Sequence, residues 1–196
     1  MSIKLVCGVG INSGKYKAKV NGKLTKEYNL WGNMLKRCYS DRFHLLNPTY
    51  IGCTVSNNFL HYEYFYEWCQ EQIGFNNDDW QLDKDLLIKG NKVYSESTCV
   101  FLPKGLNNLL VKSDGSRGEL PIGVCYHKRD KVFMSRVSLN NGYQKHLGSF
   151  NSEIEAFNAY KTSKESYIKE LAEKYKHQID ERAYQVLLDY QVEIDD

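Results

Sequence analysis

The sequence lacks any long hydrophobic run, and no stretch approaches the ~20 consecutive apolar residues of a membrane-spanning helix. It has no CxxC or HxxxH pair, which excludes zinc knuckles, thioredoxin-type motifs and zincin helices. Its six cysteines lie at least 15 residues apart, which in a chain of 196 residues favours free thiols over a disulfide scaffold. The N-terminus has no secretory signal pattern. We therefore expect a cytoplasmic protein with no membrane partner.

The composition is typical of a globular protein, with 42% hydrophobic and 26% charged residues, so global disorder is excluded. The formal net charge of +2 is unevenly distributed. Residues 1–40 carry +7 and residues 111–150 carry +4, whereas residues 41–110 carry −4 and residues 151–196 carry −5. Two basic segments separated by acidic ones suggest two surfaces that face phosphate groups, and chance clustering is the alternative.

The N-terminal segment, residues 3–20, is predicted to form a small β-hairpin, because glycines supply turn positions and residues 15–20 alternate with period two. Strand geometry would place Lys15, Lys17 and Lys19 on one face. Such a row of lysines suits a nucleic-acid backbone, and it equally suits an edge strand that is protected from aggregation by charge.

Two segments have apolar residues at helical spacing, residues 27–38 and residues 58–72. In the second segment, residues 58–72, most of the apolar residues are aromatic. An aromatic stripe at helical spacing is usually part of a hydrophobic core. We predict two helices that serve as scaffold.

Residues 82–111 have the pattern of a strand, a polar loop, a second strand and a short helix that begins near Pro103. Farther along, three strand-like runs cover residues 121–126, 132–139 and 143–150. Ser152 then begins a long helix, with Glu155 in the position of a capping box. The C-terminal half is therefore predicted to be a three-stranded antiparallel sheet covered by one long helix.

The C-terminal pattern of Ile122-Gly123-Val124, Leu147-Gly148-Ser149-Phe150 and Glu155-Ala156 through Ala159-Tyr160 resembles the AP-two-type DNA-binding domain of plant ethylene-response factors and of many phage endonucleases. In that family the sheet enters the major groove of double-stranded DNA. The resemblance implies that DNA contacts come from the sheet face, at Cys125, His127, Arg136, Ser138, Gln144 and His146, with Lys128, Arg129 and Lys145 as phosphate partners.

The segment LDKDLLIKGNKVYSESTCVFLPKGLNNLL resembles the ββα-metal motif of phage HNH endonucleases. In such a nuclease a histidine activates water, and one divalent metal stabilises the leaving oxygen. The resemblance implies that Asp83 and either Asn107 or Asn108 would hold one Mg²⁺ ion, and that Asn91 or the region of Cys99 would brace the loop.

The histidine position of this motif holds Lys84. A lysine with an ordinary pKa near ~10.4 is protonated at neutral pH and cannot accept the proton of water. Another base, Asp85 or His44, would have to act, or the site is a relic in which Lys84 neutralises a phosphate. In the alternative interpretation, Asp83 and Asp85 only cap a hairpin.

The sequence thus predicts an α+β protein with an HNH-like ββα core followed by a three-stranded antiparallel sheet on one long helix. The predicted function is phage-type binding of double-stranded DNA in a bacterial host cell, with Mg²⁺-dependent phosphodiester cleavage if the nuclease site is active. One alternative is a catalytically inactive protein that binds DNA or a host factor in a regulatory or anti-defence role. Another is a protein–protein module whose aromatic helices, rich in tyrosine, bind a host factor. The predicted divisions are a basic hairpin over 1–26, helices and HNH-like core over 27–111, a linker over 112–119, the DNA-binding domain over 120–178, and a last helix with an acidic tail over 179–196.

Overall fold

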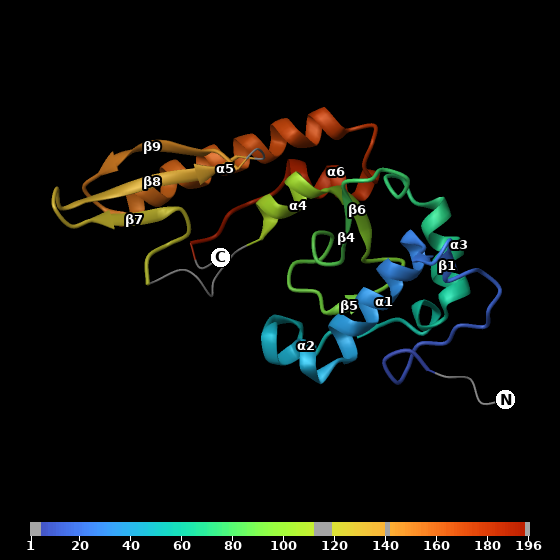
Figure 1. Ribbon diagram of the computed structural model, residues 1–196. Coiled ribbons are helices and arrows are strands. Elements are labelled where there is room, and N and C mark those ends of the chain that lie inside the picture. Colours follow the sequence, from blue (N-terminus) through green and yellow to red (C-terminus); the bar gives the residue numbers. More distant parts are fainter. Residues whose placement is uncertain (1–4, 112–118, 140–141, 195–196) are drawn as a thin grey trace. The chain divides into compact units, whose positions relative to one another are not determined.

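The computed structural model describes residues 5–111, 119–139 and 142–194 (Figure 1). The chain divides into two compact units, unit 1 over Met1–Phe101 and unit 2 over Leu102–Asp196. The division falls inside strand β6 (Val100–Pro103), earlier than the linker predicted over 112–119. That linker lies outside the described residues except for Glu119.

The helices of unit 1 agree with the apolar spacing in the sequence. The first predicted helix is α1 (Lys26–Tyr39), which begins where the Thr25 hydroxyl accepts a hydrogen bond from the Tyr28 backbone N–H. The second predicted helix is divided at His61 into a 3₁₀ turn, η2 (Asn58–Leu60), and α3 (Tyr62–Glu71). Between them lie α2 (Asp41–Leu46) and the 3₁₀ turn η1 (Pro48–Tyr50).

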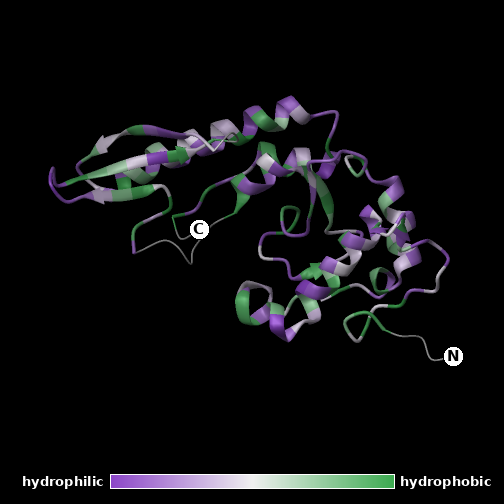
Figure 2. Ribbon diagram, viewed as in Figure 1, coloured by the Kyte–Doolittle hydropathy of each residue, from purple (hydrophilic) through white to green (hydrophobic). Residues whose placement is uncertain are grey.

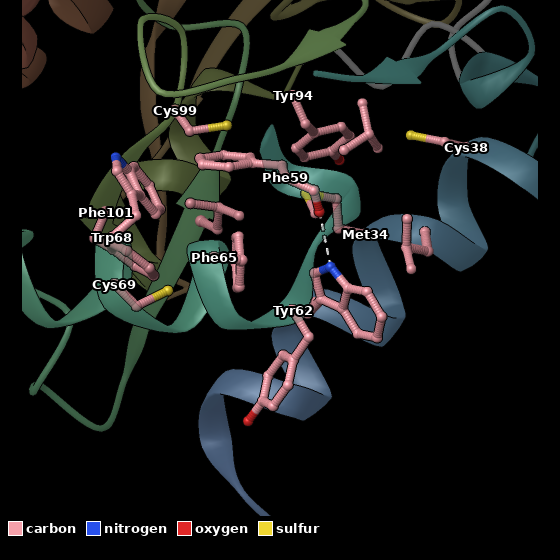
Figure 3. Packing of buried hydrophobic residues seen from close by; sticks show 14 of the residues in the cluster. Met34, Cys38, Phe59, Tyr62, Phe65, Trp68, Cys69, Tyr94, Cys99 and Phe101 are labelled. Atoms are coloured by element: carbon pink, nitrogen blue, oxygen red, sulfur yellow. Dashed lines mark hydrogen bonds between the residues drawn. The ribbon is translucent and has the colours of Figure 1, made fainter. Parts of the chain in front are cut away.

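The core of unit 1 is built from the aromatic residues of these helices, as predicted (Figure 3). Trp31, Phe59 and Phe65 are completely buried. The Trp31 indole N–H donates to the Phe59 carbonyl oxygen at 2.8 Å, so the one polar atom of this side chain has a partner inside the core. The rings of Phe59 and Phe65 meet edge to face with their centroids 5.1 Å apart. These residues are scaffold.

The predicted hairpin over residues 3–20 is wrong in its extent. The hairpin consists of β1 (Lys19–Val20) and β2 (Lys23–Leu24), and Lys15 and Lys17 lie outside strands. Its turn has two residues, Asn21 and Gly22, both at positive φ, which is the geometry of a tight hairpin. In the described part of the preceding segment, Val6 and Gly10 form an isolated antiparallel bridge. The next residue, Ile11, instead exchanges backbone hydrogen bonds with Leu60 and Tyr62, so the predicted hairpin does not continue.

The pattern predicted over residues 82–111 is present in its order of elements. Strand β4 (Trp80–Asp83) forms a two-stranded sheet with β6, and helix α4 (Lys104–Leu110) follows directly. The sequence did not indicate a short parallel pair, β3 (Thr54–Val55) with β5 (Val93–Tyr94). This pair ties the long loop between β4 and β6 to the segment that follows η1.

Unit 2 contains the predicted antiparallel sheet in the order β7 (Val124–His127), β8 (Val132–Ser138) and β9 (Gln144–Phe150). Helix α5 (Glu153–Tyr175) covers one face of this sheet (Figure 1), and α6 (Glu181–Leu188) packs on α5. The Ser152–Glu155 capping box is present. The fold is therefore α+β, with the three-stranded sheet and long helix that the sequence predicts.

Hydropathy changes along every described helix, as Figure 2 shows by its mixed colours. Among the described residues, no helix is both long and apolar enough to cross a membrane.

Candidate nucleic-acid interface

The strand register of unit 2 gathers the predicted sheet-face residues on one side of the sheet. On the central strand β8, Arg136 lies opposite His146, and Ser138 lies opposite Gln144. Because strand residues two apart share a face, Met134 lies on this same side, opposite Cys125 of β7. His127 is two residues beyond Cys125 and completes the set. We call this the open face of the sheet; its residues are Cys125, His127, Val132, Met134, Arg136, Ser138, Gln144, His146 and Ser149.

The other side of the sheet is covered by α5. Ser135 and Val137 of β8 are fully buried on that side. Arg136 and Ser138, which alternate with them along the strand, are exposed. Lys145 lies opposite Val137, and it lines a groove between β9 and α5. Lys145, which the motif resemblance groups with the phosphate partners of the sheet face, is therefore on the helix side of the sheet. Simple alternation with Gln144 and His146 would have shown this.

The turn between β7 and β8 adds charged groups at one end of the open face. His127 Nδ1 lies 3.1 Å from Asp130 Oδ2, and Arg129 Nε donates to Asp130 Oδ1 at 2.9 Å. Lys128 and Lys131 are exposed in the same turn. Residues 121–150 contain five Lys or Arg residues and one acid, so this part of unit 2 carries a clear excess of positive charge.

The open face offers the chemistry that recognition of bases and phosphates requires. Guanidinium, imidazole, hydroxyl and amide groups donate to or accept from base edges, and the basic turn can neutralise phosphates. Met134, which the motif resemblance does not include, adds an apolar contact at the centre of this face.

The N-terminal lysines do not form the row that the sequence suggested. Lys15 Nζ pairs with Glu67 Oε1 at 2.5 Å, and the Tyr16 hydroxyl donates to the same oxygen at 2.8 Å. Of the three lysines, only Lys19 is in a strand. Lys15 is therefore neutralised within unit 1, and the alternating face predicted for residues 15–20 is absent.

Asp83, the predicted metal ligand, ends strand β4 and caps the turn that follows. Its Oδ1 accepts hydrogen bonds from the backbone N–H groups of Asp85 at 2.9 Å and Leu86 at 2.7 Å. Burial, and secondarily the charge of Asp85, raises the pKa of the Asp83 carboxyl. These contacts fit the alternative interpretation, in which Asp83 closes a turn.

Lys84 is buried and held by the loop that follows it. Its Nζ donates to the Asn91 carbonyl oxygen at 3.0 Å and lies 3.1 Å from Asp85 Oδ2. In return, the Asn91 amide donates to the carbonyl oxygens of Lys84 at 2.6 Å and Val93 at 2.7 Å. Asn91 therefore braces this loop, and Lys84 serves as an internal cation.

The residues around Asp83 do not fit a Mg²⁺ site. One carboxylate oxygen is used by two backbone donors, and the ammonium group of Lys84 lies against the neighbouring Asp85. Across the described part of the chain, no group of three or more His, Cys, Asp or Glu residues is placed to hold a metal. The other predicted ligands, Asn107 and Asn108, are on α4 and belong to unit 2.

His44, the alternative base, lies on α2, where its Nε2 is 2.8 Å from the Arg37 carbonyl oxygen.

Comparison with known proteins gives no family for this chain: no family model, no curated protein and no solved structure matches it.

Proposed function

We propose that this protein binds double-stranded DNA through the open face of the unit 2 sheet. The observation that supports the proposal is the strand register, which aligns Arg136 with His146 and Ser138 with Gln144 on the side that α5 leaves uncovered. Four neighbouring polar side chains on a rigid sheet can read base edges at fixed spacing.

Duplex DNA suits this surface better than a protein partner does. A β-ribbon fits into the major groove, and the Lys and Arg residues of the β7–β8 turn lie at its end to contact phosphates. Lysine, in contrast, is depleted from protein interfaces. The exposed lysines Lys128 and Lys131 beside the open face therefore favour a polyanion.

In this proposal the protein binds duplex DNA and does not cleave it. The Asp83 side chain accepts from the backbone N–H groups of the turn that follows it, and the side chains of Lys84 and Asn91 each donate to the other's backbone carbonyl oxygen, which accounts for these residues without a metal. The regulatory or anti-defence protein considered among the sequence alternatives is consistent with such a binder.

Fluorescence anisotropy of a labelled linear duplex, measured over a series of NaCl concentrations, tests the proposal. A site with about three phosphate contacts should lose about 40-fold in affinity between about 50 and 200 mM salt. The double variant Arg136→Ala/His146→Ala should bind at least about tenfold more weakly, because it removes the central pair of the open face. Absence of duplex binding by the wild type, or binding that ignores salt, would overturn the proposal.

A further inference from the structure

A second exposed surface lies in unit 1, at the end of α2. Leu45 and Leu46 are 84% and 79% exposed, and Ile51, just after η1, is 60% exposed. Figure 2 shows the end of α2 in the green of hydrophobic residues. We call Leu45, Leu46 and Ile51 the α2 tip. Leucines this exposed make no contribution to the core, so the fold does not account for them.

The α2 tip is held rigidly by contacts on the inner side of the helix. The Phe43 ring packs edge to face on Tyr50, with centroids 5.5 Å apart. The Asn47 amide donates to the Phe43 carbonyl oxygen at 3.2 Å, and Pro48 then starts η1. Phe43 and His44, whose Nε2 lies 2.8 Å from the Arg37 carbonyl oxygen, anchor α2, so the two leucines that follow them face solvent.

Cations contact residues that adjoin the α2 tip in the chain. Lys36 Nζ lies 5.6 Å from the centroid of the Phe43 ring, and the Arg37 guanidinium lies 5.7 Å from that of Tyr50. Lys92 Nζ donates to the Thr49 carbonyl oxygen at 2.6 Å, and Arg42 is exposed on α2 itself. Residues 36–51 contain three Lys or Arg residues and one acid. The charge complements an anionic partner.

We propose that the α2 tip is a second DNA contact, in which Leu45 and Leu46 insert between base pairs from the minor groove while Lys36, Arg42 and Lys92 contact the flanking phosphates. This inference rests on the proposed function, since it supplies unit 1 with its own contact to the same ligand. Proteins that kink DNA insert one or two apolar side chains in this way.

The size of the tip favours this ligand over a protein surface. A stable protein interface buries about 800 Å² on each partner, which is far more than two leucines and an isoleucine can provide. A wedge between base pairs needs no more than such a pair of side chains, provided that cations beside it bind the backbone.

A plasmid topology experiment tests the wedge without knowledge of a target sequence. The full chain is bound to relaxed closed-circular plasmid, topoisomerase I is added, and the linking number is read on a gel after the protein is removed. Insertion between base pairs unwinds the duplex, so wild-type protein should leave the plasmid negatively supercoiled. Binding to a linear duplex is measured in parallel by anisotropy.

The test variant is Leu45→Ala/Leu46→Ala, and the matched control is Leu24→Ala/Ile73→Ala, which removes two exposed apolar side chains elsewhere in unit 1. The test variant should lose the change in linking number and keep duplex affinity within about threefold, since phosphate contacts dominate affinity. The control should retain both. Thermal unfolding monitors whether each variant is folded.

Different outcomes separate the wedge from the proposed function. The wedge is overturned if the wild type binds the duplex but does not change the linking number. It is also overturned if the leucine variant changes the linking number as much as the wild type does. Neither result contradicts the sheet interface. Absence of duplex binding overturns the proposed function and the wedge with it. Two other results would overturn the wedge by assigning the α2 tip to another partner. If the plasmid topology does not change and the protein sediments with phosphatidylserine vesicles only when both leucines are present, the tip binds a lipid surface. If the protein instead forms a leucine-dependent dimer in analytical ultracentrifugation, the tip binds a second copy of the chain.

Discussion

Arg136 and Lys145 lie on adjacent strands of one sheet but on opposite faces of it. Arg136 is opposite His146 on the open face, whereas Lys145 is opposite the buried Val137 on the face that α5 covers. Both side chains are exposed, so charge and accessibility alone do not distinguish them. Their positions allow the proposed DNA-binding face to be tested by single substitutions.

Arg136→Ala should weaken binding to a linear duplex about tenfold or more, as expected for loss of an arginine that contacts a base edge. Lys145→Ala removes the same formal charge from the same sheet and should change the affinity by less than about threefold. Anisotropy at fixed salt measures both. An equal loss in the two variants would mean that general charge, not the open face, determines binding.

Metal removal distinguishes binding from cleavage. Duplex affinity in EDTA should be at least as high as in Mg²⁺, because the residues around Asp83 do not form a metal site and Mg²⁺ competes with the protein for phosphates. Supercoiled plasmid should stay intact with wild type, Asp83→Ala and Lys84→His in Mg²⁺ or Mn²⁺. Metal-dependent nicking by the wild type that Asp83→Ala abolishes would refute this interpretation, and nicking by Lys84→His alone would reveal a metal site disarmed at one residue.

The loop between β4 and β6 should depend on Asn91. The side chain of Asn91 donates to the carbonyl oxygens of Lys84 and Val93 and accepts from the Val93 N–H at 3.1 Å. Asn91→Ala removes these three hydrogen bonds and should lower the free energy of unfolding by about 1–3 kcal/mol, measured by urea denaturation. Asn33→Ala, which loses one exposed hydrogen bond to Asn29, is the control and should change it by less than about 0.5 kcal/mol.

The parts of the fold that follow from local patterns could be predicted from the sequence. Trp31, Met34, Leu35 and Cys38 recur at helical spacing and are all buried on α1. The capping box of Ser152 and Glu155 fixed the start of α5. Alternation along β8 was sufficient to place Arg136 and Ser138 on one face.

The remaining features depend on contacts between distant residues. The parallel pair of β3 and β5 is two residues long on each side and relies on bonds such as Thr54 N–H to the Lys92 carbonyl oxygen, so it has no local period. The role of Lys84 depends on Asn91 across a loop, which a motif resemblance does not reveal. The exposure of Leu45 and Leu46 likewise follows from how Phe43 packs.

Gly123, just before β7, should tolerate no side chain. Its φ is +79°, and a Cβ atom there would collide with the Tyr160 ring of α5. Gly123→Ala should therefore destabilise unit 2 by at least about 3 kcal/mol, through backbone strain and overpacking together. Gly142 also has a positive φ, +77°, but a Cβ atom there would meet no atom within 4 Å. Gly142→Ala should therefore lower the free energy of unfolding by only about 1–2 kcal/mol, and thermal unfolding of the two variants measures the difference. An equal decrease in the free energy of unfolding in the two variants would mean that the collision with Tyr160 does not contribute to the destabilisation.

Lys164 should destabilise unit 2 at neutral pH. Its side chain is only 6% exposed on α5, and burial lowers its pKa from 10.5 to about 8. Its ammonium group lies 5.9 Å from the centroid of the Tyr160 ring, which compensates only in part for lost hydration. Lys164→Met retains the apolar stem and removes the charge, so it should raise the free energy of unfolding by about 1–3 kcal/mol at pH 7.

The pH dependence of this gain identifies its cause. Between about pH 8 and 10.5 the unfolded chain still binds a proton at Lys164 and the folded chain does not, so wild-type stability rises with pH relative to the variant. The advantage of Lys164→Met should therefore be constant below about pH 7 and shrink as the pH rises through that window. Paired urea denaturations at pH 7 and pH 9.5 measure it, with Lys161→Met on the same helix as the control. A pH-independent gain would show that better packing, and not removal of a buried charge, stabilises the variant.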